Sequence, residues 1–130
     1  MAQRFLVDTH VVIEAGTEDG LEAMPARVRG ILEDSEAELL LSVVSEAEVA
    51  IKSRIRKLEL TKDELSLIRS NASINSYPLR RKHIDQLFEL PLHHKDPFDR
   101  LIISTALCDN LPVISREKQF RRYKGLRVIW

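Results

Sequence analysis

Short apolar runs alternate with segments of helical periodicity along the whole chain. Residues 4–7 form an apolar run that ends at Asp8, which predicts a buried strand, and a short helix over about 9–15 is expected to follow, with Gly16 at its end. Further extended segments are predicted at 38–42, 76–79, 112–115 and 126–129, and further helices from Pro25, Ser45, Thr61, Arg80 and Asp96. Strands separated by helices are typical of βαβ units. The sequence therefore predicts one α/β domain over residues 1–130, with three α/β/α layers and a central, mainly parallel sheet.

Composition narrows the class of protein without changing this picture. The chain has 130 residues, of which 44% are hydrophobic, enough for one core. Its 20 basic and 20 acidic residues balance, which excludes a nucleic-acid binder that depends on bulk positive charge. The single cysteine, Cys108, excludes an internal disulfide. Apolar stretches of about six residues fall far short of the roughly 20 that span a bilayer, so we expect a soluble, cytoplasmic protein with no membrane partner.

Acidic residues fall where the predicted strands end. Asp8 closes the first strand, and Glu48 is expected in the first turn of the helix after the second strand. Asp96 and Asp99 begin the helix that leads to the strand at 112–115, and Glu117 lies just beyond that strand. Ligands of open α/β sheets bind beyond the carboxyl ends of the strands. We therefore expect these carboxylates to meet at one edge of the sheet.

Simpler interpretations of the same residues remain open. Glu48 could close a capping box that starts at Ser45, and Asp96 could be the N-cap of its helix. Glu117 could form a surface ion pair with a basic neighbour in its own segment. Asp8 is harder to explain in this way, because a carboxylate buried at the end of an apolar strand requires a cation or a hydrogen-bond donor.

Converging carboxylates predict a divalent cation, since only positive charge offsets their repulsion. A site built from oxygen atoms favours Mg²⁺ or Mn²⁺ over zinc. The histidines are not at zinc-site spacing and are expected at the surface or behind the ligands: His10, His83, His93 and His94. Carboxylate-bound magnesium is suited to phosphodiester hydrolysis.

Three blocks of sequence resemble the PIN-domain family. They are Leu6-Val7-Asp8-Thr9-His10-Val11-Val12, residues 41–52 and residues 90–103. The last block contains Asp96-Pro97-Phe98-Asp99-Arg100 and is similar to the signature of the VapC-type toxins. The resemblance spans essentially the whole chain. It implies a PIN fold, a Mg²⁺- or Mn²⁺-dependent ribonuclease that cuts RNA, and the toxin of a type II toxin–antitoxin pair, which forms a homodimer and binds an antitoxin protein.

The resemblance also implies roles for individual residues. Asp8, Glu48 and Asp99 match the three core acids of the family, and Glu117 stands where the family usually has Asp. The predicted metal ligands are these four, which are also the predicted catalytic residues, together with Asp96. Thr9 and Ser115 are expected to support them by hydrogen bonds.

Basic residues are grouped in three clusters within this neutral chain, over 52–57, 80–82 and 116–124. Such clusters position RNA through its phosphates without reading its sequence, although solvated helix faces have the same composition. Lys52, Arg100 and Arg116 are the predicted RNA contacts.

Two other functions are compatible with parts of the pattern. A catalytically weak or inactive PIN-fold module that binds RNA or a protein partner is favoured by Glu117 in place of Asp. A phosphoacceptor receiver domain also clusters acids beside a parallel sheet, but it requires an acid pair after the first strand. The segment Asp8-Thr9-His10 lacks that pair.

Overall fold

A five-stranded parallel sheet forms the centre of the protein. The computed structural model describes residues 2–130. Its strands are β1 (Arg4–Val7), β2 (Glu38–Ser42), β3 (Ile74–Tyr77), β4 (Val113–Ile114) and β5 (Val128–Ile129). Their order is β3-β2-β1-β4-β5, and every pair of neighbouring strands is parallel. The predicted parallel sheet is therefore confirmed.

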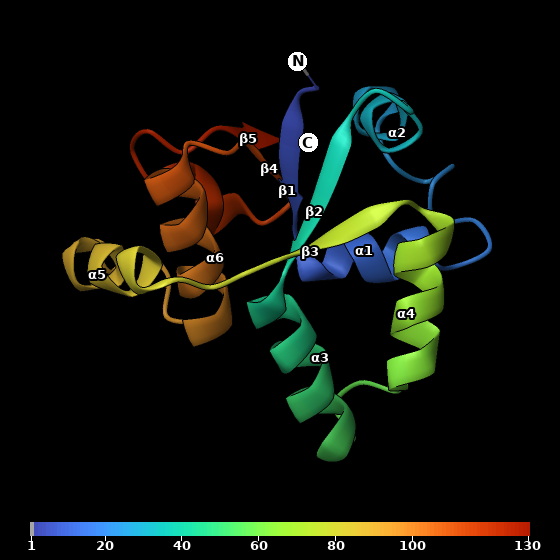
Figure 1. The fold of residues 1–130 in the computed structure, drawn as a ribbon, viewed down its shortest axis with the longest axis horizontal. Helices are drawn as coiled ribbons and strands as arrows, with labels where there is room; N and C mark the ends of the chain where they lie inside the picture. Colours follow the sequence, from blue (N-terminus) through green and yellow to red (C-terminus); the bar gives the residue numbers. More distant parts are fainter. Residues whose placement is uncertain (1) are drawn as a thin grey trace.

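Helices cover both faces of the sheet. They are α1 (Thr9–Ala15), α2 (Ala26–Leu32), α3 (Val43–Arg54), α4 (Lys62–Asn71), α5 (Arg81–Glu89), α6 (Pro97–Asp109) and the short 3₁₀ helix η1 (Lys118–Arg122). In Figure 1, α1, α2 and α4 lie on one side of β1 and β2, and α5 and α6 lie on the other. The three predicted layers are thus confirmed. None of these helices, within residues 2–130, is long and apolar enough to cross a membrane.

Alternating side chains of the strands feed two separate cores. Val7 and Leu41 pack with the helices α1, α2 and α4, whereas Leu6 and Leu40 pack against α6. All four side chains are almost fully buried. Because both faces of the sheet are covered, the strands are apolar at successive positions instead of alternating with polar residues. Packing on both faces therefore holds the carboxyl ends of the strands in a fixed position.

The start of α3 differs from the prediction. The helix begins at Val43, and the Ser42 hydroxyl accepts a hydrogen bond from the backbone N–H of Val44 at 3.0 Å. The capping box predicted at Ser45 is therefore wrong, and Glu48 lies in the second turn instead of the first. The reason is tertiary, because the Ser45 hydroxyl accepts a buried 2.7 Å hydrogen bond from Thr9. By contrast, the capping box at Thr61 is confirmed.

The sheet has a topological switch point at β1. After β1 the chain builds β2 and β3 on one side, and it later returns to place β4 and β5 on the other. The backbone N–H of Asp8 donates to the carbonyl of Ile114 at 3.0 Å, which ties the end of β1 to the end of β4. A crevice beyond the carboxyl ends of the strands at such a point is the usual ligand site of an open α/β sheet.

Candidate active site

Asp8 lies at this switch point with one carboxylate oxygen unpaired. It is 1% exposed, and Oδ2 accepts a hydrogen bond from the Ser115 hydroxyl at 2.7 Å. Its other oxygen, Oδ1, is buried without a hydrogen-bond partner. Burial raises the pKa of Asp8 above its ordinary value, against the lowering effect of the Ser115 hydrogen bond. A buried carboxylate oxygen without a donor is costly, because it has lost contact with water and gained no partner.

Glu48 approaches the same edge from α3. It is 2% exposed, Oε2 accepts a 2.5 Å hydrogen bond from Lys52, and Oε1 is buried without a partner. Lys52 follows Glu48 by one helical turn, so the two side chains share one face of α3. Glu48 therefore acts neither as a helix cap nor as a solvated surface acid.

Asp99 enters the site from the first turn of α6. The residue is buried, and its Oδ2 is 2.7 Å from Nε2 of His94. Burial, with the charges of Asp8 and Asp96, raises the pKa of Asp99 to about 6 against the lowering effect of the His94 hydrogen bond. A carboxyl with a pKa this close to neutrality is typical of a functional site.

Asp96 holds the start of α6 in place. Its Oδ1 accepts a hydrogen bond from the backbone N–H of Asp99 at 2.9 Å, and Pro97 follows at the first helical position. The predicted N-cap role is confirmed. Asp96 also lies close enough to Asp99 to raise its pKa, so it adds negative charge at the rim of the site.

Glu117 follows β4. Its backbone N–H donates to the Ser115 hydroxyl at 3.1 Å, and its side chain does not cap the helix η1 that follows. Its charge contributes to the raised pKa of Asp8. A surface ion pair between Glu117 and a basic neighbour was one possible interpretation. Its neighbour Arg116 pairs with Glu14 instead.

These acids are close enough to influence one another. Glu48 and Glu117 raise the pKa of Asp8, and Asp8 in turn raises that of Asp99. Segments from four parts of the sequence thus bring negative charge to the carboxyl ends of β1, β2 and β4. The structure places the predicted site residues at one edge of the sheet.

A family model matches most of the chain. The PIN domain model matches residues 5–126, which include all of these acids. The chain belongs to the PIN domain family.

Solved structures with this fold include PIN domains at low sequence identity. The VapBC2 structure from Rickettsia felis, bound to a promoter DNA fragment, matches with a TM-score of 0.70 at 14% identity, covering 98% of both chains. The DNA-bound VapBC structure from Salmonella typhimurium has a TM-score of 0.68 at 18% identity, covering 99% of this chain and 98% of that one. A toxin–antitoxin complex from Klebsiella pneumoniae has a TM-score of 0.58 at 21% identity, covering 96% of this chain and 95% of that one. No curated protein matches the sequence closely enough to count as a relative.

The donor atoms of this PIN domain fit a hard divalent cation. The two unpaired buried atoms, Oδ1 of Asp8 and Oε1 of Glu48, are anionic oxygens of the kind that Mg²⁺ and Mn²⁺ prefer. Within residues 2–130, however, no three of these acids have ligand atoms all within 4.8 Å of one another. Each acid is turned toward its own donor: Ser115 for Asp8, Lys52 for Glu48 and His94 for Asp99. Such spacing is expected of carboxylates that repel one another.

The predicted RNA contacts have different surroundings in the PIN fold. Lys52 is half-buried against Glu48, and Arg116 is exposed beside Glu14. The Arg100 guanidinium donates to the carbonyls of Pro91, His94 and Leu90 and to the Tyr123 hydroxyl. Arg100 therefore fastens the loop before α6, whereas Lys52 is bound to Glu48 and Arg116 to Glu14.

A second cluster, away from this edge, brings together three side chains of the kinds that bind metal ions. Within residues 2–130, His83, Cys108 and Asp109 are the set whose ligand atoms all lie within 4.8 Å. However, Nδ1 of His83 accepts a hydrogen bond from the backbone N–H of Arg80 at 2.9 Å, which places the ring proton on Nε2. That nitrogen then has no lone pair for a metal, so the cluster does not fit a metal site.

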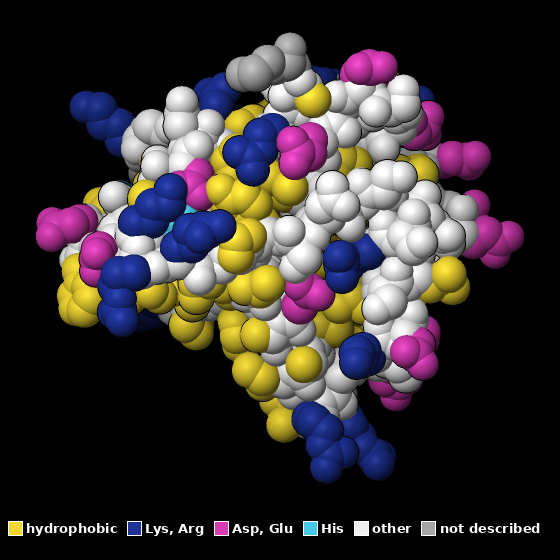
Figure 2. Space-filling view, in the orientation of Figure 1, with side chains coloured by type: hydrophobic (Ala, Val, Ile, Leu, Met, Phe, Trp, Pro, Cys, Tyr) yellow, Lys and Arg dark blue, Asp and Glu magenta, His cyan; other side chains and the backbone are white. Residues whose placement is uncertain are grey.

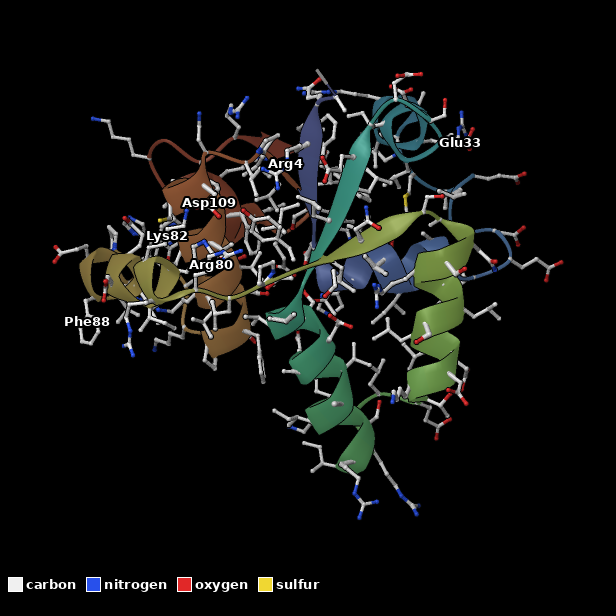
Figure 3. The ribbon with its side chains drawn as sticks, viewed as in Figure 1. Arg4, Glu33, Arg80, Lys82, Phe88 and Asp109 are labelled. Atoms are coloured by element: carbon white, nitrogen blue, oxygen red, sulfur yellow. The ribbon has the colours of Figure 1, made fainter. Side chains whose placement is uncertain are left out.

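This cluster instead joins α5 to the end of α6. Asp109 accepts hydrogen bonds from the Tyr77 hydroxyl and from Nε2 of His83 at 2.7 Å, and Lys82 lies 2.8 Å away. Figure 3 shows Lys82 and Asp109 next to each other between these helices. Although burial raises the pKa of Asp109, these donors outweigh it and hold the pKa at about 2.

His94 is the residue of the site whose role the sequence did not reveal. Of the two positions expected for it, at the surface or behind the ligands, the structure shows the second, because Nε2 lies 2.7 Å from Oδ2 of the predicted ligand Asp99. The sequence did not indicate which acid it would contact. Its backbone N–H and that of His93 both donate to the Tyr123 hydroxyl, which fixes the loop. A spacing of five residues ahead of Asp99, across a helix start, is no recognised motif, so no local signal could have shown this contact.

Proposed function

We propose that this PIN domain is a Mg²⁺- or Mn²⁺-dependent endoribonuclease and the toxin of a toxin–antitoxin pair. The observation that supports it best is the pair of buried carboxylate oxygens without partners, on Asp8 and Glu48, at the switch point of the sheet. Asp99 completes the ligand set, and Glu117 and Asp96 add charge at its edge.

A cation bound there would supply the acidity that activates a water for attack on a phosphodiester and would neutralise the departing oxygen. The residues of the chain have the remaining tasks. Ser115 fixes the orientation of the Asp8 carboxylate, and His94 fixes that of Asp99 and favours its ionised form. Lys52 and Arg116 attract the phosphates of an RNA strand to the crevice.

The proposed protein partner is an antitoxin, and a second copy of the chain is proposed to form a homodimer. The solved toxin–antitoxin complex from Klebsiella pneumoniae has this fold. Large apolar side chains are exposed on α3 and around α5: Ile51, Ile55, Phe88 and Leu92. Figure 2 shows hydrophobic side chains along α3 with Lys and Arg at its far end. Exposed apolar surface of this kind suits contact with another protein.

The alternative is a PIN-fold module that binds RNA or protein without cutting. Two observations favour it: Glu117 stands where the family usually has Asp, and Lys52 occupies an oxygen of Glu48. The two proposals differ in whether metal addition produces RNA cleavage.

The test is cleavage of a labelled single-stranded RNA by the purified protein. We expect cleavage with Mg²⁺ or Mn²⁺, none with EDTA, and none from Asp8→Asn with either metal. Asp19→Asn is the matched control, because Asp19 is exposed and the chemical change is the same. Absence of cleavage by the wild type with both metals, or cleavage that survives chelation, would reject the nuclease proposal. Growth arrest on expression of the wild type, but not of Asp8→Asn, tests the toxin role separately.

A further inference from the structure

The Lys52 side chain is more buried than that of a surface lysine, and it contacts an acid of the site directly. Its ammonium is 2.5 Å from Oε2 of Glu48, and the side chains are 29% and 3% exposed. The ammonium also lies 6.0 Å from the centre of the Phe98 ring, on the first turn of α6. The exposed pair of Arg4 and Glu38 differs, since both of its side chains are about 40% exposed. Lys52 is thus held between α3 and α6 at the mouth of the site.

The ammonium faces more than its own partner. The hydrogen bond to Glu48 raises the pKa of Lys52, and the charges of Asp96 and Asp99 on α6 raise it further. Near the other acids, the Arg100 guanidinium is engaged with the loop carbonyls and Arg116 with Glu14. Lys52 is therefore a main source of positive charge for the cluster.

An oxygen of Glu48 cannot serve the ammonium and a metal ion equally well. A cation bound at the edge of the sheet would be attracted by the same carboxylate charge that Lys52 neutralises. Because four methylene groups separate the ammonium from the backbone, Lys52 can leave Glu48 and turn toward solvent without moving α3. Glu48 itself stays buried in either state, fixed by its place in the second turn of the helix.

We propose that Lys52 is an internal counter-ion that competes with the divalent cation for Glu48 and so sets the affinity of the site for metal. The proposal rests on the metal site of the proposed function. It assigns Lys52 a role in addition to RNA contact: the lysine neutralises the acids when no metal is bound and is released toward the substrate when the metal enters.

The test is a titration of the metal-free protein with Mn²⁺, in which the electron paramagnetic resonance signal of free Mn²⁺ measures how much is bound. Lys52→Met is expected to bind Mn²⁺ about three- to tenfold more tightly than the wild type, because one competing charge next to a buried carboxylate is removed. Lys52→Arg keeps the charge and is expected to stay close to the wild type. Lys57→Met is the matched control, since Lys57 is exposed and the same charge is removed further along the chain. Thermal unfolding gives a second measure: saturating Mn²⁺ should raise the melting temperature more in Lys52→Met than in the wild type.

The outcomes separate this proposal from the proposed function. If the wild type binds Mn²⁺ and Asp8→Asn does not, the metal site stands. Equal or weaker Mn²⁺ binding by Lys52→Met would then overturn the role of Lys52 alone. Equal tightening in Lys52→Met and Lys57→Met would also overturn it, because the effect would reflect net charge. A wild type that binds no Mn²⁺ and cuts no RNA would reject both.

Discussion

Nε2 of His94 lies 2.7 Å from Oδ2 of Asp99, across the start of α6. The contact opposes the effect of burial, which raises the pKa of Asp99 to about 6. It depends on a loop that Arg100 and Tyr123 hold by hydrogen bonds to its backbone. His94 thus favours the ionised form of Asp99, which is the form that a cation would bind.

Replacement of His94 should shift the pH dependence of cleavage. In His94→Phe the hydrogen bond that favours ionised Asp99 is lost, so the pKa of Asp99 should rise above about 6. A rise of about one unit reduces the ionised fraction roughly threefold at pH 6.5 and very little at pH 8.5. Cleavage rates measured across this range should show a defect that recovers at high pH. His94→Gln, which keeps a donor, is the control, and a defect that is constant with pH would contradict this role.

Neutralising Asp99 should stabilise the metal-free protein at high pH. The pKa of this acid rises from 3.8 to about 6 on folding, so the folded state binds the proton more tightly than the unfolded chain. The free energy of unfolding then falls as pH rises from about 4 to about 6. Asp99→Asn should be more stable than the wild type by about 1 to 2 kcal/mol at pH 8, after allowance for solvent screening, and no more stable at pH 4. Urea unfolding at both values tests this, and a less stable variant at pH 8 would contradict it.

Asp96 variants should separate helix capping from metal binding. Asp96→Ala should lower the free energy of unfolding by about 1 kcal/mol, because the N–H of Asp99 loses its acceptor. Asp96→Ser restores an acceptor without the carboxylate and should recover that stability. We expect Asp96→Ser to retain cleavage, since the structure commits an oxygen of Asp96 to the cap. A stable Asp96→Ser protein without activity would instead make Asp96 a required ligand.

Much of the fold followed from local pattern. The strand at 38–42 and the helix at 9–15 have the predicted bounds, because the strand is a continuous apolar run and the helix ends at Gly16. The start of α3 was wrong because Ser42 and Ser45 are both good caps by sequence. A contact with Thr9, 36 residues earlier, decides between them. Local propensity cannot contain such information.

The sequence predicted the acids and one of their partners, because Ser115 was expected to support them and donates to Asp8. Thr9 was also expected to support them, but it donates to Ser45 instead. Asp8, Glu48 and Asp99 follow from strand ends, helix starts and family resemblance. Lys52 was expected to meet RNA, and the structure shows it on Glu48. The carbonyls bound by Arg100 lie on a loop whose path is set by packing. Side-chain contacts within an irregular loop produce no periodic pattern in the sequence.

The hydrogen bond between Ser115 and Asp8 joins residues 107 positions apart. Asp8, Glu48 and Asp99 all precede β4 in the chain, so they are synthesised before it. Until that strand docks beside β1, Asp8 has neither its hydroxyl donor nor the backbone that holds it. A nascent chain therefore carries its acids in an unassembled form, and the site assembles only after β4 and Ser115 have been synthesised.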